Sequence, residues 1–164
     1  MSIGGTNGMR RLLAYLLVTL LLAVAGCQHS NPVKGPSPAA KEIILFDDHN
    51  AITLATDAAT IEEASLQRDF LRLQVAYGGG CRKHDFKLYG STSFMESYPV
   101  QTKIYLSHDA HGDRCKALVR DEMIFDLSPL KQAYRYMYRT GMGPIRLRIY
   151  EPGLREQHRI LYEF

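Results

Sequence analysis

The sequence predicts a mainly β protein, an antiparallel β-sandwich with one short α-helix at about residues 128–140. From Lys41 onward, apolar residues recur mostly at every second position, which is the period of β-strands. About seven short segments follow this pattern, and one segment has clear helical spacing, so a two-layered sandwich is favoured over a small open barrel.

The strands are predicted in chain order from this alternation. The segment EIILFDD at 42–48 reads as one strand, and TIEEASLQRDFLRLQVAY at 60–77 as two strands joined by a tight turn at Arg68 and Asp69. A helix over Ile61–Leu66 is the alternative for the first of these two, because Glu and Ala favour helices. Further strands are expected at 84–89, 100–108, 115–127, 145–150 and 156–164. The third of these includes EMIFDL at 122–127, with a bulge before this segment as an option.

The single helix has recognisable start and stop signals. Ser128 is a suitable N-cap, and Pro129 fits the first helical position. Leu130, Tyr134 and the residues after them follow at helical spacing. Gly141 is expected to end the helix.

The first 26 residues have the three parts of a lipoprotein signal peptide. Arg10 and Arg11 precede an uncharged apolar run at 12–25, which is too short to span a bilayer. The run ends in VAGC at 24–27, which resembles a bacterial lipobox, so Cys27 is predicted to carry a covalent lipid such as palmitate. Two alternatives are cleavage after AVA at 23–25, which would give a soluble exported protein, and an uncleaved anchor.

The remaining chain is predicted to comprise a lipidated N-terminus and flexible tether at 27–41, followed by a single β-sandwich domain at 42–164. Residues 28–41 are rich in Pro, Ser, Gly and Ala, as linkers are. Gln28, at the second position of the processed chain, favours the outer membrane if the organism has one. The signal peptide holds two of the 20 basic residues and none of the 17 acidic ones. The net charge of the remaining chain is therefore 18 − 17 = +1. This balance and export both argue against a nucleic-acid partner.

Two cysteines remain if Cys27 is lipidated, and both are expected outside the cytosol, where disulfides persist. The favoured interpretation is therefore a Cys81–Cys115 disulfide. Strand alternation places His84 and His108 in phase with apolar residues at strand ends. The turn at 109–113 would bring His108 and Cys115 close together, so one end of the sandwich is expected to hold these four residues.

A metal site is the sharper alternative at the same place. Thiolate and imidazole are ligands that zinc prefers, so Cys81, His84, His108 and Cys115 could form a structural zinc site. Alternatively, the disulfide stays intact and His84, His108 and either Asp113 or Asp109 bind the metal. Catalysis is less favoured: Cys81 with His84 could form a thiol–imidazole pair, but Ser107 and His108 are strand neighbours and point apart.

Several motifs together resemble a group of uncharacterised bacterial lipoproteins, some of which have a NigD-like C-terminal β-sandwich. The motifs are GGGC-x2-H-x-F-x-L, SYPVQ, LSHDAHGDRC and FDLSPL. The resemblance implies an exported β-sandwich in which Cys81, His84, His108, Asp113 and Cys115 occupy motif positions.

The sequence thus predicts a non-enzymatic envelope lipoprotein that binds or scaffolds a partner. The partners expected are the membrane, through the lipid, and an envelope protein or polysaccharide, through loops near Met95–Tyr98 and Asp109–Asp113. The alternatives are a metal-binding envelope protein that uses His84 and His108, and a hydrolase with an unrecognised site.

Overall fold

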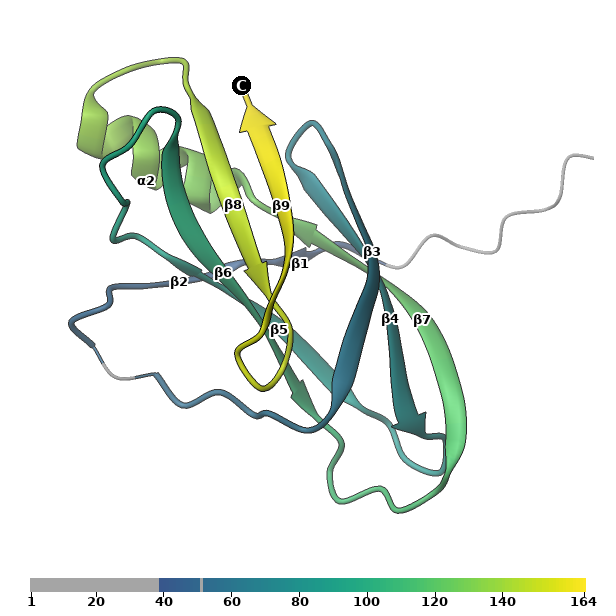
Figure 1. Cartoon of the computed structure of the whole chain (residues 1–164). Coiled ribbons are helices and arrows are strands. Elements are labelled where there is room, and N and C mark those ends of the chain that lie inside the picture. The colour runs from purple at the N-terminus through teal and green to yellow at the C-terminus, as the bar shows by residue number, and fades with distance from the viewer. Residues whose placement is uncertain (1–38, 51) are drawn as a thin grey trace, which may run out of the picture. The chain divides into compact units, whose positions relative to one another are not determined.

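The computed structural model describes residues 39–50 and 52–164, and the predicted signal peptide, Cys27 and most of the predicted tether lie outside this range. Its elements are β1 (Lys41–Glu42), β2 (Ile44–Phe46), β3 (Ala59–Gln67), β4 (Phe70–Gly79), β5 (Asp85–Ser91), β6 (Val100–Asp109), β7 (Ala117–Asp126), α2 (Ser128–Tyr138), β8 (Pro144–Tyr150) and β9 (Glu156–Glu163) (Figure 1). Within the described residues, no helix is both long enough and apolar enough to cross a membrane.

The strands form two sheets, and the predicted β-sandwich is confirmed. One sheet has the order β1-β7-β4-β3 and the other the order β2-β5-β6-β8-β9. Their inner faces share one apolar core, in which Leu71, Leu73 and Val75 of β4 are fully buried as the alternation predicts. Leu147 and Ile149 of β8 close the core from the other sheet.

The sheets are mixed rather than wholly antiparallel. The pairs β1–β7, β2–β5 and β6–β8 are parallel. Strands β6 and β8 can run parallel because β7 and α2 lie between them in the chain and provide the long crossover that a parallel pair needs. Alternation indicates which face of a strand is buried but not which direction its neighbour runs, so this feature was not predictable.

The segment predicted as one strand at 42–48 is divided between the two sheets. Lys41 and Glu42 pair with Phe125 and Asp126 of β7, and the next three strand residues pair with β5. Ile43 lies at the crossing, is 3% exposed and packs against Gly90 of β5. A Cβ at Gly90 would lie 2.7 Å from Cδ1 of Ile43, so the glycine provides the space for the crossing.

Two local predictions about turns and helices have clear outcomes. Residues 61–66 belong to strand β3 rather than to a helix, and Arg68, with φ 55°, forms the turn to β4. The helix forms as predicted, but its N-cap is Leu127 rather than Ser128. The Ser128 amide and hydroxyl instead donate to Oδ1 of Asp126, at 2.8 and 2.6 Å.

The helix also ends earlier than predicted. Its last residue is Tyr138. The left-handed residue that ends the helix is Arg139, with φ 51°, and not Gly141 as predicted.

Candidate functional site

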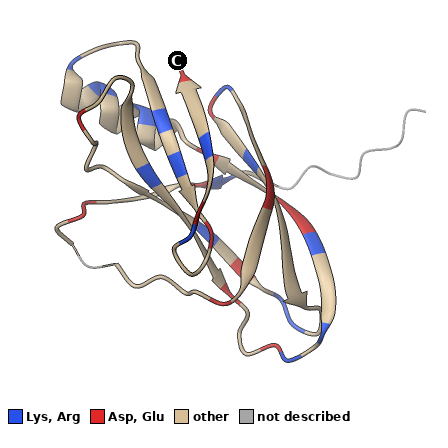
Figure 2. Cartoon of the chain, viewed as in Figure 1, with Lys and Arg blue, Asp and Glu red and all other residues tan. Residues whose placement is uncertain are grey.

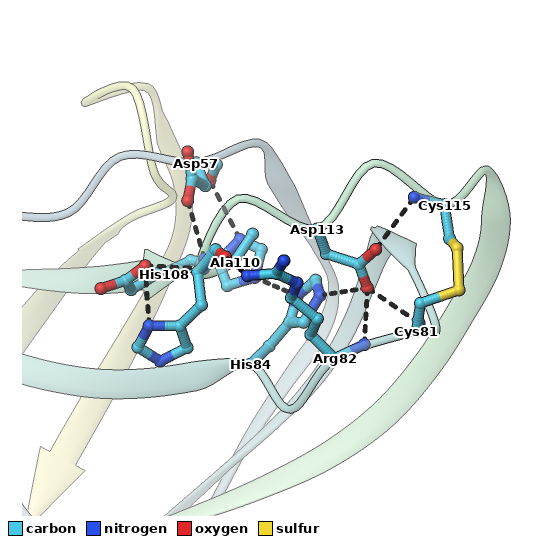
Figure 3. A network of polar contacts seen from close by, with 10 residues as sticks. Asp57, Cys81, Arg82, His84, His108, Ala110, Asp113 and Cys115 are labelled. Carbon is cyan, nitrogen blue, oxygen red and sulfur yellow. Dashed lines mark hydrogen bonds and ion pairs between the residues drawn. A yellow bond between two sulfur atoms is a disulfide. The ribbon is translucent and has the colours of Figure 1, made fainter.

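A disulfide between Cys81 and Cys115 closes one end of the four-stranded sheet. The two Cα atoms are 5.9 Å apart, and Gly79 and Ala117 are the last paired residues of β4 and β7 before it. The predicted pairing is therefore present in the structure, and it uses both sulfur atoms that the four-ligand zinc alternative requires (Figure 3).

The Asp113 carboxylate joins the two ends of this disulfide. Its Oδ1 accepts the Cys115 amide at 2.9 Å, and its Oδ2 accepts the amides of Cys81 and Arg82, each at 2.9 Å. The side chain is 1% exposed. The hydrogen bond from the Cys115 amide, together with those from Cys81 and Arg82, holds the pKa of Asp113 well below its ordinary value, so the group is an anion.

Two buried histidines continue from Asp113 into the sandwich. His84 Nε2 lies 3.3 Å from Asp113 Oδ2, and His84 Nδ1 lies 2.8 Å from His108 Nε2. His108 Nδ1 lies 3.1 Å from the backbone oxygen of Asp57. The four groups form a row that leads from the disulfide to the segment that contains Asp57 (Figure 3).

The hydrogen-bond partners indicate which ring nitrogens of His84 and His108 donate. The row begins at a carboxylate and ends at a carbonyl, and both can only accept, so His84 Nε2 and His108 Nδ1 donate. The contact between the rings needs a hydrogen on one of the two facing nitrogens, His84 Nδ1 or His108 Nε2. Burial lowers the pKa of His108, which favours its neutral form. A neutral His108 that donates from Nδ1 accepts at Nε2 in its contact with His84.

Aromatic packing encloses the two rings. His108 stacks on Phe86 with centroids 4.3 Å apart and an interplanar angle of 6°. Tyr77 lies 4.7 Å from the His84 ring. A Cβ at Gly79 would lie 2.6 Å from the His84 ring, so the glycine run before Cys81 makes room for this histidine as well as turning the chain.

The metal-binding alternative meets an obstacle in this arrangement. Two nitrogens that share a tetrahedral zinc lie about 3.3 Å apart on either side of the ion. Here His84 and His108 contact each other directly at 2.8 Å, and Asp113 contacts the opposite nitrogen of His84. The three predicted ligands lie in a row rather than around a point, so a bound ion would have to break the contact between the histidines.

Among the described residues, one group of three ligand-type side chains has all its ligand atoms within 4.8 Å of one another: Cys81, Asp113 and Cys115. Its two cysteines are joined in the disulfide, so the Asp113 carboxylate is the one remaining ligand group of the three.

Ser107, His108 and Asp109 are residue types of a catalytic triad, but the Ser107 hydroxyl is hydrogen-bonded to the backbone and not to a histidine. The Ser107 hydroxyl donates to the Ala55 oxygen and accepts the Ala55 amide, both at 3.0 Å, and does not contact His108. Cys81 has no free thiol. Ser107 and the backbone of His108 thus hold the segment around Ala55 against β6.

Sequence reasoning placed Cys81, His84, His108 and Cys115 at one end of the sandwich, and the structure brings these four together with Asp113. It missed the contributions of Tyr77 and Asp57. Alternation put Tyr77 on the buried face of its strand, but nothing in it indicated contact with the histidines. Asp57 acts through its backbone oxygen, which no sequence pattern reports.

The lowered pKa of His108 predicts a pH-dependent contribution to stability. Above its unfolded value of about 6.5 the residue is neutral in both states, and below it the unfolded chain takes up the proton first. The stability that the folded protein gains from a neutral His108 is therefore lost as the pH falls. We expect the advantage of the wild-type protein over His108→Phe to shrink between about pH 7 and about pH 5 in urea unfolding. A constant or growing advantage would contradict the neutral assignment.

The fold and the site together define a disulfide-braced, mixed β-sandwich, and solved structures share this fold. A NigD-like immunity protein from Bacteroides caccae matches with a TM-score of 0.53 and 17% identity over 76% of this chain and 63% of that one. A candidate lipoprotein from Bacteroides fragilis matches with a TM-score of 0.50 and 13% identity over 76% of this chain and 68% of that one. The NigD-like fold that the motifs implied is thus supported.

These similarities extend over part of the related proteins and concern the fold. The chain covers 63% of the NigD-like protein and 56% of a Bacteroides vulgatus protein of unknown function, so it spans less than two thirds of their length. No protein-family profile and no curated protein sequence matches the chain.

Proposed function

We propose that the chain is a non-enzymatic lipoprotein of the bacterial cell envelope whose β-sandwich binds or scaffolds another envelope component. One observation carries the choice of binding over catalysis: the polar cluster is fully engaged in holding the fold. The disulfide takes both sulfurs, Asp113 uses both oxygens, and all four ring nitrogens of His84 and His108 have partners.

The envelope location is supported by two independent features. The VAGC sequence at 24–27 leaves Cys27 as the cysteine outside the disulfide, and disulfides persist outside the cytosol. A structure of the same fold is a candidate lipoprotein. Gln28 extends this proposal to the outer membrane.

A hollow on the outer face of the five-stranded sheet is the proposed contact surface. Its volume is about 380 Å³, within the range of ligand sites. Tyr105 lies in its lining with Phe46 and Lys103, and the Tyr105 ring is 6.0 Å from that of Phe46. Leu54 and Leu154 contribute apolar side chains. The hollow therefore offers aromatic, apolar and charged groups to one partner.

The two loops predicted as contact surfaces differ in the structure. Tyr98, in the loop before β6, is 97% exposed and free to meet a partner. The turn at 109–113 is occupied internally, because Asp113 binds the disulfide amides and His111 pairs with Asp85 at 2.9 Å. The hollow and the Tyr98 loop are thus favoured over the turn.

Photo-crosslinking in intact cells tests the binding surface. A photoreactive residue at Leu154, which is 57% exposed beside the hollow, should give a defined adduct. The matched control is Leu118 on β7 of the other sheet, which is 65% exposed. Mass spectrometry of the adduct separates a protein partner from a polysaccharide. No adduct at Leu154, or the same adducts at both positions, would overturn the proposed surface.

Fractionation of the same cells tests the anchor. The wild-type chain should enter the membrane fraction with a lipid-modified N-terminal peptide, and Cys27→Ser should lose both the lipid and the membrane association. In a Gram-negative host, Gln28→Asp is expected to move the lipidated protein from the outer to the inner membrane. Membrane association that survives Cys27→Ser without lipid would contradict the proposed anchor.

A further inference from the structure

The stretch from Leu127 to Tyr150 comprises α2, the turn after it and β8, and it is basic along its whole length. It contains no Asp or Glu, and its charged residues are Lys131, Arg135, Arg139, Arg146 and Arg148. In Figure 2 α2 and β8 accordingly carry blue segments and no red ones. Lys131 pairs with Asp69 and Arg148 with Glu156, but the described residues provide no ion pair for the other three.

Large apolar side chains lie exposed on the same stretch. Tyr136 of α2 is 89% exposed and Met142 in the following turn is 77% exposed, and Met137 is also exposed. These residues are not needed by the core, because α2 buries Leu130 and Tyr134 instead. Exposed apolar side chains rimmed by polar ones are a feature of interaction surfaces.

The loop before β6 adds to this surface. Val100 at the start of β6 pairs in parallel with Ile145 of β8, so the residues that precede each strand lie at the same end of the sheet. Tyr98 and Met142 are therefore at one end of the sandwich. Phe94 of the same loop packs edge-on against Tyr134 of α2, with centroids 5.6 Å apart, which places the loop against the helix.

We infer that α2, the turn after it and the Tyr98 loop form a docking surface for a bilayer that contains anionic phospholipids. The inference rests on the proposed envelope lipoprotein and adds a second membrane contact beside the lipid. This set of elements is called the docking surface.

The side-chain chemistry of the docking surface matches that of a membrane interface. Tyrosine is enriched at the level of the headgroups, where its ring is in apolar surroundings and its hydroxyl is hydrated. Arginine can bury its aliphatic stem and still reach a phosphate. Basic residues near a membrane surface are attracted to anionic lipids. Arg139, at the end of α2, has no ion pair among the described residues and is free to act in this way. Glu96, which lies near Tyr138, and Glu163, which pairs with Pro144, oppose part of the basic charge.

The start of the folded domain lies close to α2. Lys41 and Glu42 pair with Phe125 and Asp126, and α2 begins at Ser128 (Figure 1). An 11-residue helix is about 16 Å long, and a tether over 28–40 can reach roughly 45 Å when fully extended. A lipid on Cys27 therefore leaves α2 within reach of the bilayer that holds the lipid.

Vesicle co-sedimentation tests this inference on the chain from Gln28 onward, which lacks the lipid site and retains the whole compact unit Pro38–Phe164. The probes are vesicles of phosphatidylcholine alone and of phosphatidylcholine mixed with phosphatidylglycerol. The chain should bind the mixed vesicles, and raising the salt concentration should weaken this binding. The double variant Tyr136→Ser, Arg139→Gln should lose about tenfold in affinity.

The matched control is Leu118→Ser, Arg114→Gln, which removes one exposed apolar side chain and one exposed arginine away from the docking surface. It should bind like the unmodified chain. Equal binding to both vesicles, an equal loss in both double variants, or no binding would overturn the inference. Self-association that the Tyr136 variant abolishes, without vesicle binding, would assign the surface to a second copy and would also overturn it.

This result is independent of the anchor test. If vesicle binding holds but Cys27 carries no lipid in cells, the anchor is wrong and the docking surface stands. If Cys27 is lipidated but the vesicle experiment fails, the docking surface is wrong and the proposed lipoprotein stands.

Discussion

Replacing Cys81 and Cys115 with serine is expected to lower the free energy of unfolding by about 4 kcal/mol. The disulfide joins residues 34 positions apart, and cutting it releases a long loop in the unfolded chain. It also removes the constraint that holds two amides on Asp113. Urea unfolding of the oxidised wild-type protein and the double variant gives the difference.

Reduction of the wild-type protein should reproduce most of this loss. The corresponding control is reduction of the double serine variant, which has no disulfide to lose and should be unchanged. A loss below about 1 kcal/mol in the double variant would show that the disulfide is dispensable for the fold, and would weaken the argument that oxidising surroundings are needed.

The second large effect is expected at His108, where alanine should cost about 3 kcal/mol. The side chain is 1% exposed, stacks on Phe86 and connects His84 to the Asp57 oxygen. Its removal leaves a cavity and deprives both neighbours of a partner. Thermal or urea unfolding measures the loss.

His111 provides the matched control for His108. It contacts the Asp85 carboxylate at 2.9 Å, but its side chain is 46% exposed. His111→Ala should therefore change the free energy of unfolding by less than about 0.5 kcal/mol. Similar losses for the two alanine variants would contradict the assignment of the buried row as a stabilising element.

The sequence allowed the buried faces of the strands to be predicted because alternation is a local property. Leu71, Leu73 and Val75 follow from it directly, as does the turn at Arg68. The direction of pairing is not local. Whether β6 meets β8 in parallel depends on the length and course of the intervening chain, and the crossing at Ile43 depends on space provided by Gly90.

The candidate site was predictable in its members but not in its connections. Cysteine counting and strand phase grouped Cys81, His84, His108 and Cys115. Two imidazole nitrogens that are hydrogen-bonded differ by only a few tenths of an ångström in separation from two that hold a metal ion. A sequence does not give distances with this precision. Asp113 was predicted as a metal ligand, and in the structure it receives the amides of Cys81, Arg82 and Cys115.

The crossing of the N-terminal segment has a mechanical consequence for a protein held at its N-terminus. A pull applied before Lys41 acts on β1, which is hydrogen-bonded to β7, and is passed through buried Ile43 to β2, which is hydrogen-bonded to β5. The load is thereby divided between both layers of the sandwich and does not peel one edge strand away. We expect the domain to resist forces exerted through its anchor better than a sandwich whose first strand belongs to one sheet.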